Sequence, residues 1–272
     1  MASTLYAWAC PAVFSSSPVD HTWVTAFDNR TDRYAKIEDV VASGAEYWFC
    51  WGVYHGEGQS GVHAAGLLGV QTGDPSQARC VARPNAVSKD EPDARGTVLL
   101  YGIHGVCHQI ANQVLFATRT TGKPLTVRRA RGYWLSDFFW KTYGTNSRTW
   151  RERAGTCGLG GGKGAVGMIP EGAVSDLFAQ RAAALLSDDP AKLSGLIGLC
   201  QEGRAEKTSK ALVAPPSAGA INDRNWEIQQ EAAAILGETR FRQVFELNPD
   251  QYVELVDETM YAAQAGERTS GR

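Results

Sequence analysis

The sequence changes character close to its middle, and this change constrains the fold more than any other feature. Over residues 1–150 aromatic and β-branched residues gather in short runs, whereas the later part is rich in Ala, Leu, Glu and Gln at helical spacing. Between them, residues 155–167 (GTCGLGGGKGAVG) hold too much glycine for the interior of a helix or strand. We therefore expect a strand-containing domain over residues 1–150, followed by a glycine-rich loop and helical extension over residues 151–272.

In the first part, short runs of β-branched and aromatic residues predict strands, and a long apolar periodicity predicts a helix. The strands are expected at residues 21–27, 46–54, 97–103 and 125–134, and the helix at 107–118. A shorter helix is expected at 136–144, with Ser136 or Asp137 as its N-cap.

In the second part, amphipathic patterns predict four helices, at residues 173–187, 188–203, 225–237 and 248–264. The last is expected to have Asn248 as its cap and Pro249 at its first helical position.

Charge and hydropathy exclude several classes of protein. With 27 Lys and Arg against 29 Asp and Glu, nothing in the overall charge favours nucleic acid or an anionic membrane. No apolar run approaches the roughly 18 residues of a membrane span, and Pro11 interrupts the only candidate for a secretory signal. We expect a protein that is cytoplasmic as synthesised and not integral to a membrane, with signal-independent export left open.

Six cysteines lie far apart along the chain, which favours reduced thiols over a disulfide framework. They show no Cys-x-x-Cys spacing, and the five histidines form no zinc-binding array, so we expect neither a metal nor a cofactor. Cys107 is distinctive because it lies where the apolar run 97–103 leads into the helix at 107–118. The first turn of a helix favours a thiolate, and Gly102 and Gly105 would let a substrate approach the backbone.

A thiol nucleophile also needs an imidazole to take its proton. His108 follows Cys107 directly and would point roughly 100° away around the helix axis, which aims it poorly at the sulfur. His104 lies in the preceding loop and lacks a rigid support. His21, on an early strand, is the best candidate for the base.

The order of the strand with His21, the strand with Glu46 and the helix with Cys107 resembles the circularly permuted branch of the NlpC-type papain-like peptidases. That branch includes relatives of lecithin retinol acyltransferase. His21 on an early strand, Glu46 at the head of the next strand and Cys107 in GVCHQIANQ follow that branch's order over about residues 15–135. The resemblance implies an α+β, permuted papain-like fold. In it an antiparallel sheet packs on the helix that bears the cysteine, and the C-terminal helices form an extension.

The resemblance also implies a catalytic triad of Cys107, His21 and Glu46. Asp28, Asp32 and His55 stay open as alternatives to Glu46 for the third group. We expect four residues to contact the substrate, namely His104, Gly105, Trp48 and Trp51.

The expected function is hydrolysis of an amide through a thioester intermediate, as by a peptidase or amidase acting on peptidoglycan peptides or another amide. The expected substrate is a peptide, a glycan-peptide or an acyl group. An acyltransferase or lipid thioesterase of the same fold is one alternative. Another is a non-catalytic ligand-binding or partner-binding protein, with a partner protein docked on the C-terminal helices.

The glycine-rich segment fails the P-loop pattern, because Gly164 rather than Ser or Thr follows Lys163. It contains a G-x-G-x-x-G pattern from Gly162 to Gly167, but no strand precedes it as dinucleotide binding requires. We interpret it as a flexible loop that could act as a lid.

Overall fold

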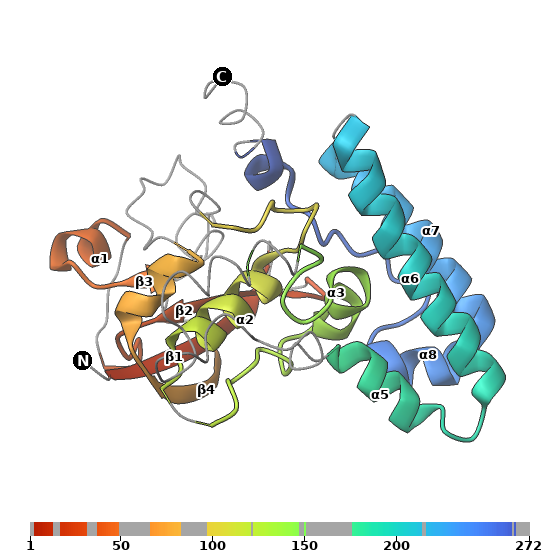
Figure 1. Cartoon of the computed structure of the whole chain (residues 1–272), viewed down its shortest axis with the longest axis horizontal. Helices are drawn as coiled ribbons and strands as arrows, with labels where there is room; N and C mark the ends of the chain where they lie inside the picture. Colours follow the sequence, from red (N-terminus) through yellow and green to blue (C-terminus); the bar gives the residue numbers. More distant parts are fainter. Residues whose placement is uncertain are drawn as a thin grey trace, which may run out of the picture.

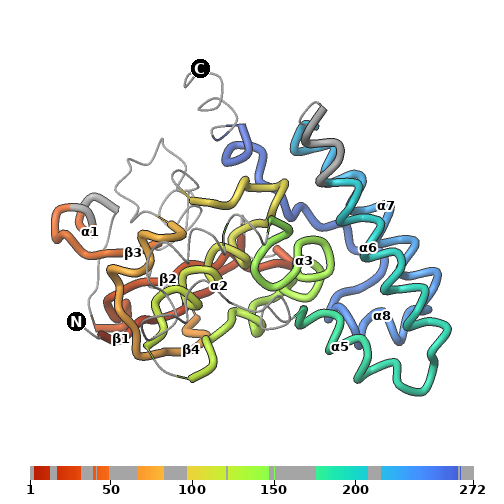
Figure 2. Tube along the Cα trace, in the orientation of Figure 1, coloured from red at the N-terminus to blue at the C-terminus, as the bar shows by residue number. Residues whose placement is uncertain are grey.

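The computed structural model describes residues 3–12, 17–31, 37–48, 66–82, 97–120, 122–146, 150, 176–213, 216–262 and 264. Over these residues it is a mixed α+β fold, with the sheet and helix α2 at one end and the helices α5 to α8 at the other (Figure 1). Helix α3 lies between the two groups, as the trace in Figure 2 also shows.

The sheet has four antiparallel strands in the order β3-β2-β1-β4. β2 (Asp20–Thr25) overlaps the strand expected at 21–27, beginning one residue earlier, and β3 (Tyr47–Trp48) lies within the one expected at 46–54. β1 (Ser3–Pro11) and β4 (Gly66–Gly73) complete the sheet. β1 was not predicted; its residues from Tyr6 to Pro11 pair with β2.

Two hydrophobic cores lie on the two faces of β2. Val24 joins the main core, which also contains the apolar residues of α2 (Cys107–Thr118). Trp23 joins a smaller core with Trp8 and Tyr47. Because successive side chains of a strand point to opposite faces, even-numbered residues of β2 face α2 and odd-numbered residues face the smaller core.

The remaining helices of the first part are short. They are α1 (Ile37–Ser43), the 3-10 helix η2 (Pro75–Cys80) and α3 (Tyr133–Trp140). α3 begins after Gly132, which has a left-handed backbone with φ of 73°, so the prediction that Ser136 or Asp137 caps this helix is wrong. A side chain at position 132 would lie 2.1 Å from Val19 Cγ1, so this turn requires glycine.

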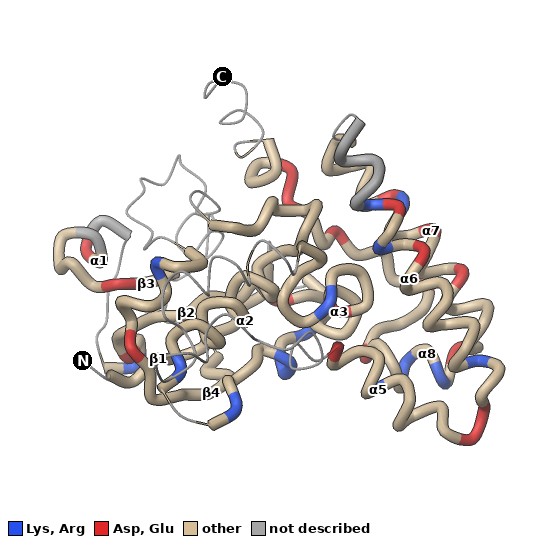
Figure 3. Tube along the Cα trace, viewed as in Figure 1, with Lys and Arg blue, Asp and Glu red and all other residues tan. Residues whose placement is uncertain are grey.

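The later helices are α5 (Leu177–Leu185), α6 (Pro190–Val213), α7 (Ala218–Leu236) and α8 (Glu238–Phe245). The first three overlap predicted helices, although α6 ends ten residues later than predicted and α7 begins seven residues earlier. Figure 3 shows basic and acidic residues interspersed along α6 and α7. No helix among the described residues is both long and apolar enough to cross a membrane.

Two predicted elements are wrong, and a third is present only in part. Residues 97–103 form turns, with one isolated bridge between Tyr101 and Gly105. Residues 125–132 form an irregular segment that leads into α3. Of the helix predicted at 248–264, residues 248–257 are not helical, so Asn248 and Pro249 begin no helix, whereas residues 258–262 and 264 are helical. Helix α8, which was not predicted, ends before this segment.

Side-chain amides take the place of regular backbone pairing in these segments. Gln264 accepts from the Tyr101 N–H at 2.6 Å and donates to the Leu99 carbonyl at 3.1 Å. Asn222 binds both backbone polar groups of Val256, at 2.9 and 3.0 Å. Because buried backbone groups must find partners, these amides let the segments pack in the core without forming a strand or helix.

Candidate functional site

Helix α2 begins at Cys107, which confirms the expected position of this thiol in the first helical turn. The preceding Val106 has an extended backbone, and its N–H donates to Gln109 Oε1 at 3.0 Å. This bond satisfies one backbone donor that the start of a helix would otherwise leave without a partner. The thiol therefore lies at a helix N-terminus that a side chain already caps.

The thiol of Cys107 lies against β2 and is almost closed to solvent. Only 9% of the residue is exposed, and Sγ lies 3.9 Å from the Asp20 carbonyl oxygen. Burial raises the pKa of Cys107 to about 11, although the main chain and hydroxyl of the neighbouring Thr22 act in the opposite direction. The group is a neutral thiol at physiological pH in this arrangement.

His108 points to the same part of β2. Its Nε2 lies 2.9 Å from the Asp20 carbonyl oxygen, the same atom that the Cys107 thiol approaches, and its Nδ1 lies 2.7 Å from Ser136 Oγ. Because a carbonyl oxygen only accepts, a neutral His108 carries its proton on Nε2 and accepts from Ser136 at Nδ1. Burial lowers the pKa of His108 to about 4, which keeps the ring neutral.

The structure does not aim His21 at Cys107. His21 is buried and stacks on Trp23, with ring centroids 5.9 Å apart, and lies opposite Cys10 of β1. It therefore occupies the face of β2 away from α2, whereas Thr22 lies beside the Cys107 sulfur. The prediction that the His21 imidazole lies next to the Cys107 sulfur is therefore wrong in this arrangement. Placing His21 on a strand did not tell which face of the sheet its side chain occupies.

Glu46 also lies away from the thiol. Its carboxylate pairs with Arg79 at 2.5 Å, at the end of η2. Of the alternatives for the third group, Asp28 forms an ion pair with Arg30 at 2.7 Å in a turn, and Asp32 and His55 lie outside the described residues.

The residues expected to contact substrate are divided. His104 and Gly105 do lie in the turn before Cys107, and the His104 carbonyl accepts from the Thr145 N–H at 2.9 Å. Trp48 is fully buried in the main core, which leaves none of its surface for a ligand. Trp51 lies outside the described residues, as does the glycine-rich segment 155–167.

Reduced thiols were expected throughout, and this expectation is wrong for Cys80, which is disulfide-bonded. Its partner lies outside the described residues, since the described Cys10, Cys107 and Cys200 are free. Among the described residues no group of three or more His, Cys, Asp or Glu side chains could hold a metal ion.

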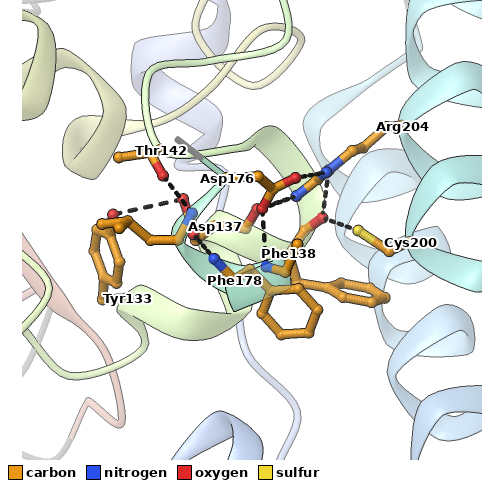
Figure 4. Close-up of polar contacts among 10 residues, drawn as sticks. Tyr133, Asp137, Phe138, Thr142, Asp176, Phe178, Cys200 and Arg204 are labelled. Carbon is orange, nitrogen blue, oxygen red and sulfur yellow. Dashed lines mark hydrogen bonds and ion pairs between the residues drawn. The ribbon is translucent and has the colours of Figure 1, made fainter. Parts of the chain in front are cut away.

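A second buried polar cluster joins α3 to the later helices (Figure 4). Arg204 of α6 donates to the carbonyl oxygens of Phe138 and Asp137, at 2.8 and 2.6 Å, and pairs with Asp176 at 2.5 Å. The Asp137 carboxylate accepts from the Phe178 N–H at 2.6 Å. Burial raises the pKa of Asp137 to about 7, and the nearby Asp176 acts in the same direction.

The contacts of this second cluster are those of a structural joint. Arg204 satisfies carbonyl groups at the C-terminal end of α3, and Asp137 satisfies an N–H group in the first turn of α5. Neither role was predicted from the sequence, because a lone arginine in an amphipathic helix carries no signal for it.

No family model, curated protein or solved structure matches this chain.

Proposed function

We propose that this protein is a cysteine-dependent hydrolase that cleaves an amide through a thioester on Cys107. One observation carries the proposal: the thiol of Cys107 and the imidazole of His108 reach the same carbonyl oxygen of β2 at the start of a helix packed on an antiparallel sheet. The proposed substrate class is a peptide or glycan-peptide, with acyl transfer as the variant chemistry on the same thioester. The permuted papain-like fold is part of this proposal.

In this proposal His108 is the base, because its ring lies on the same side of β2 as the sulfur. Acting as the base requires the other tautomer, protonated at Nδ1. In that tautomer the Nδ1–H donates to Ser136 Oγ, the Ser136 hydroxyl donates to the Tyr133 carbonyl at 2.8 Å, and Nε2 must give up its hydrogen bond to the Asp20 carbonyl. Nε2 then takes the thiol proton as Sγ attacks the carbonyl carbon, and returns it to the leaving amine. The competing assignment is the triad of Cys107, His21 and Glu46, in which His21 is the base and Glu46 orients it.

The hydrogen bonds that an imidazolium needs are already present. Its Nδ1–H would donate to Ser136, and its Nε2–H to the Asp20 carbonyl. The resting pair is nevertheless far from ionised, since the pKa values of Cys107 and His108 are about 11 and about 4. Moving the proton would cost roughly 10 kcal/mol in this arrangement. The proposal therefore requires substrate binding to change the surroundings of the pair.

The test is acylation of the intact chain by p-nitrophenyl acetate, followed by peptide mass mapping. We expect acetylation at Cys107 to be faster than at Cys10 and Cys200, and to slow at least tenfold in His108→Gln but not in His21→Gln. Cys200→Ala is the matched control, since Cys200 is also buried and has a pKa raised to about 12. A loss in His21→Gln alone would favour the competing triad. Equal labelling of the three thiols would sink the hydrolase proposal.

A second candidate function, ligand binding without catalysis, is favoured by the burial of the thiol and by an open basic groove. The groove holds about 620 Å³, and Arg181 packs on the face of Trp134 there, 4.4 Å from the ring centroid. It is lined by Arg128, Arg129, Trp134, Leu177, Gln180, Arg181 and Glu246. Three arginines against one glutamate would suit an acidic ligand.

This second function is tested by calorimetric titration with poly-L-glutamate at low salt. Binding that weakens at least tenfold in the Arg128→Glu, Arg129→Glu double variant, with no thiol acylation in the first test, would favour it over hydrolysis.

A further inference from the structure

The open groove of about 620 Å³ brings together arginines from two separate parts of the chain. Arg128 and Arg129 come from the irregular segment before α3, and Arg181 comes from α5. The only acidic residue among the described lining residues is Glu246, which follows α8. Three arginines against one glutamate leave two net positive charges in the groove.

Arg181 is held in one orientation by its own contacts. Its Nε donates to the Val244 carbonyl at 2.8 Å, and its Nη2 donates to the Gln243 carbonyl at 2.6 Å and to Glu246 at 2.7 Å. The guanidinium also packs on the ring of Trp134. Nη1 has no acceptor among the described residues and is not one of their buried polar atoms. Two N–H donors of a fixed guanidinium are therefore accessible and without an acceptor.

Arg128 and Arg129 occupy the two central positions of a tight turn. The Ala130 N–H donates to the Val127 carbonyl at 2.9 Å across this turn, and the Val127 N–H donates to Asn112 of α2, also at 2.9 Å. Both arginines are exposed, and neither forms a hydrogen bond or an ion pair with another described residue. The turn thus presents two guanidinium groups without a counter-ion on a base that α2 holds in place.

The charge and the donors of the groove favour phosphate over carboxylate. A carboxylate brings one charge and two oxygens, whereas a phosphate monoester brings close to two charges and three strong acceptor oxygens. The planar fork of an arginine matches phosphate geometry and donates two parallel hydrogen bonds to it. One phosphate group would neutralise the two net positive charges, and Leu177 offers an apolar surface beside them.

We propose that this groove binds an organic phosphate monoester, whose phosphate oxygens accept from Arg128, Arg129 and Nη1 of Arg181 while its organic part lies against Leu177. The proposal rests on the second candidate function, because it names the acidic ligand of the same groove. The three guanidinium groups gain the acceptors that they lack, and the turn and α5 hold them in place before the ligand binds.

The test is isothermal titration calorimetry of the full chain with phenyl phosphate at pH 7.5 and low salt. We expect saturable binding. Benzoate, which carries a ring but a single charge, should bind about tenfold more weakly. Inorganic phosphate, which lacks the apolar part, should bind about fivefold more weakly. Equal binding of benzoate would overturn the choice of phosphate, and equal binding of inorganic phosphate would overturn the choice of an organic ester.

Two variants locate the site. Arg128→Ala and Arg129→Ala should each weaken the binding of phenyl phosphate about tenfold, because each removes a charged donor. Both positions are exposed, so the variants should fold. Lys123→Ala is the matched control, since this exposed lysine lies in the same segment but does not line the groove. Unchanged binding in both arginine variants would overturn the proposal.

The outcomes also separate this proposal from the functions on which it builds. Binding of poly-L-glutamate without binding of phenyl phosphate would overturn the phosphate ester and leave the second candidate function standing. Cys107→Ala should leave the binding of phenyl phosphate unchanged, so the thioester chemistry can fail separately.

Discussion

The Nδ1 atom of His108 lies 2.7 Å from the hydroxyl oxygen of Ser136, and both residues are buried between α2 and α3. This bond joins the helix that bears Cys107 to the helix that the C-terminal part holds in place. Since Nε2 is bound to a backbone carbonyl of β2, the imidazole links three elements of the fold. Its protonation state should therefore affect stability as well as chemistry.

We predict that His108 makes the protein less stable as the pH falls from about 6.5 to about 4. The folded pKa of His108, about 4, lies below the ordinary value of 6.5, so the unfolded chain binds more protons in this window. Its contribution is complete above pH 6.5 and amounts to roughly 3 kcal/mol. Urea unfolding of the native chain and of His108→Gln from pH 7 to pH 4 measures it. The difference in free energy of unfolding between the native chain and the variant should shrink as the pH falls. A difference that stays constant with pH would contradict the prediction.

Asp137 should act in the opposite direction. Its folded pKa of about 7 exceeds the ordinary 3.8, so the folded chain binds more protons between these values and loses stability as the pH rises through them. Asp137→Asn keeps an acceptor for the Phe178 N–H and removes the charge. As the pH rises from 4 to 8, we expect the free energy of unfolding of the variant, measured in urea, to rise relative to that of the native chain by up to roughly 4 kcal/mol. Asp250→Asn, at an exposed site, should show no such gain.

Gly132→Ala should destabilise the start of α3. A Cβ atom there would lie 2.1 Å from Val19 Cγ1 and 2.8 Å from Val19 Cβ, at a φ of 73°. We expect a loss of more than about 2 kcal/mol from overlap and backbone strain together. Gly122→Ala separates the two causes, because its φ is 70° and nothing lies within 4 Å of its Cβ position. That control should lose only about 1 kcal/mol, and equal losses in thermal unfolding would show that overlap with Val19 plays no part.

Arg204→Met should loosen the joint between α3 and the later helices. The guanidinium donates to two carbonyl groups of α3 and pairs with Asp176, and the residue is only 8% exposed. We expect a loss of about 3 kcal/mol, since the partners would keep buried acceptors without donors. Arg242→Met, which removes an exposed pair with Glu238, should cost less than about 1 kcal/mol. If the two variants unfold at similar urea concentrations, Arg204 does not stabilise the contact between α3 and the later helices.

The sequence predicted the elements whose own pattern determines them. β2 combines β-branched and aromatic residues, and α2 has an unbroken helical periodicity, so both were located from local preference. The position of Cys107 at the first turn of α2 followed from the same pattern. On the same helix, Asn112 accepts from the Val127 N–H at 2.9 Å.

The elements that failed share a physical cause. Residues 97–103 and 125–134 are as apolar as a buried strand. Such a pattern indicates that a segment is buried, but it does not tell whether the segment forms a strand. Which partner satisfies a buried backbone group is decided by residues distant in sequence: Gln264 binds residues 99 and 101, and Gln71 accepts from the Leu125 N–H at 3.0 Å. A side-chain amide 54 or more residues away leaves no periodic signal.

The candidate site divides in the same way. The sequence by itself determined that one thiol begins a helix behind a glycine-containing turn, because helix starts and glycine positions are local properties. Only the tertiary structure decided which imidazole shares its surroundings. Strand alternation places His21 on the far face of β2, and the packing of α2 on that strand brings His108 to the carbonyl oxygen that Cys107 approaches. Burial then sets both groups neutral, which no count of residues could reveal.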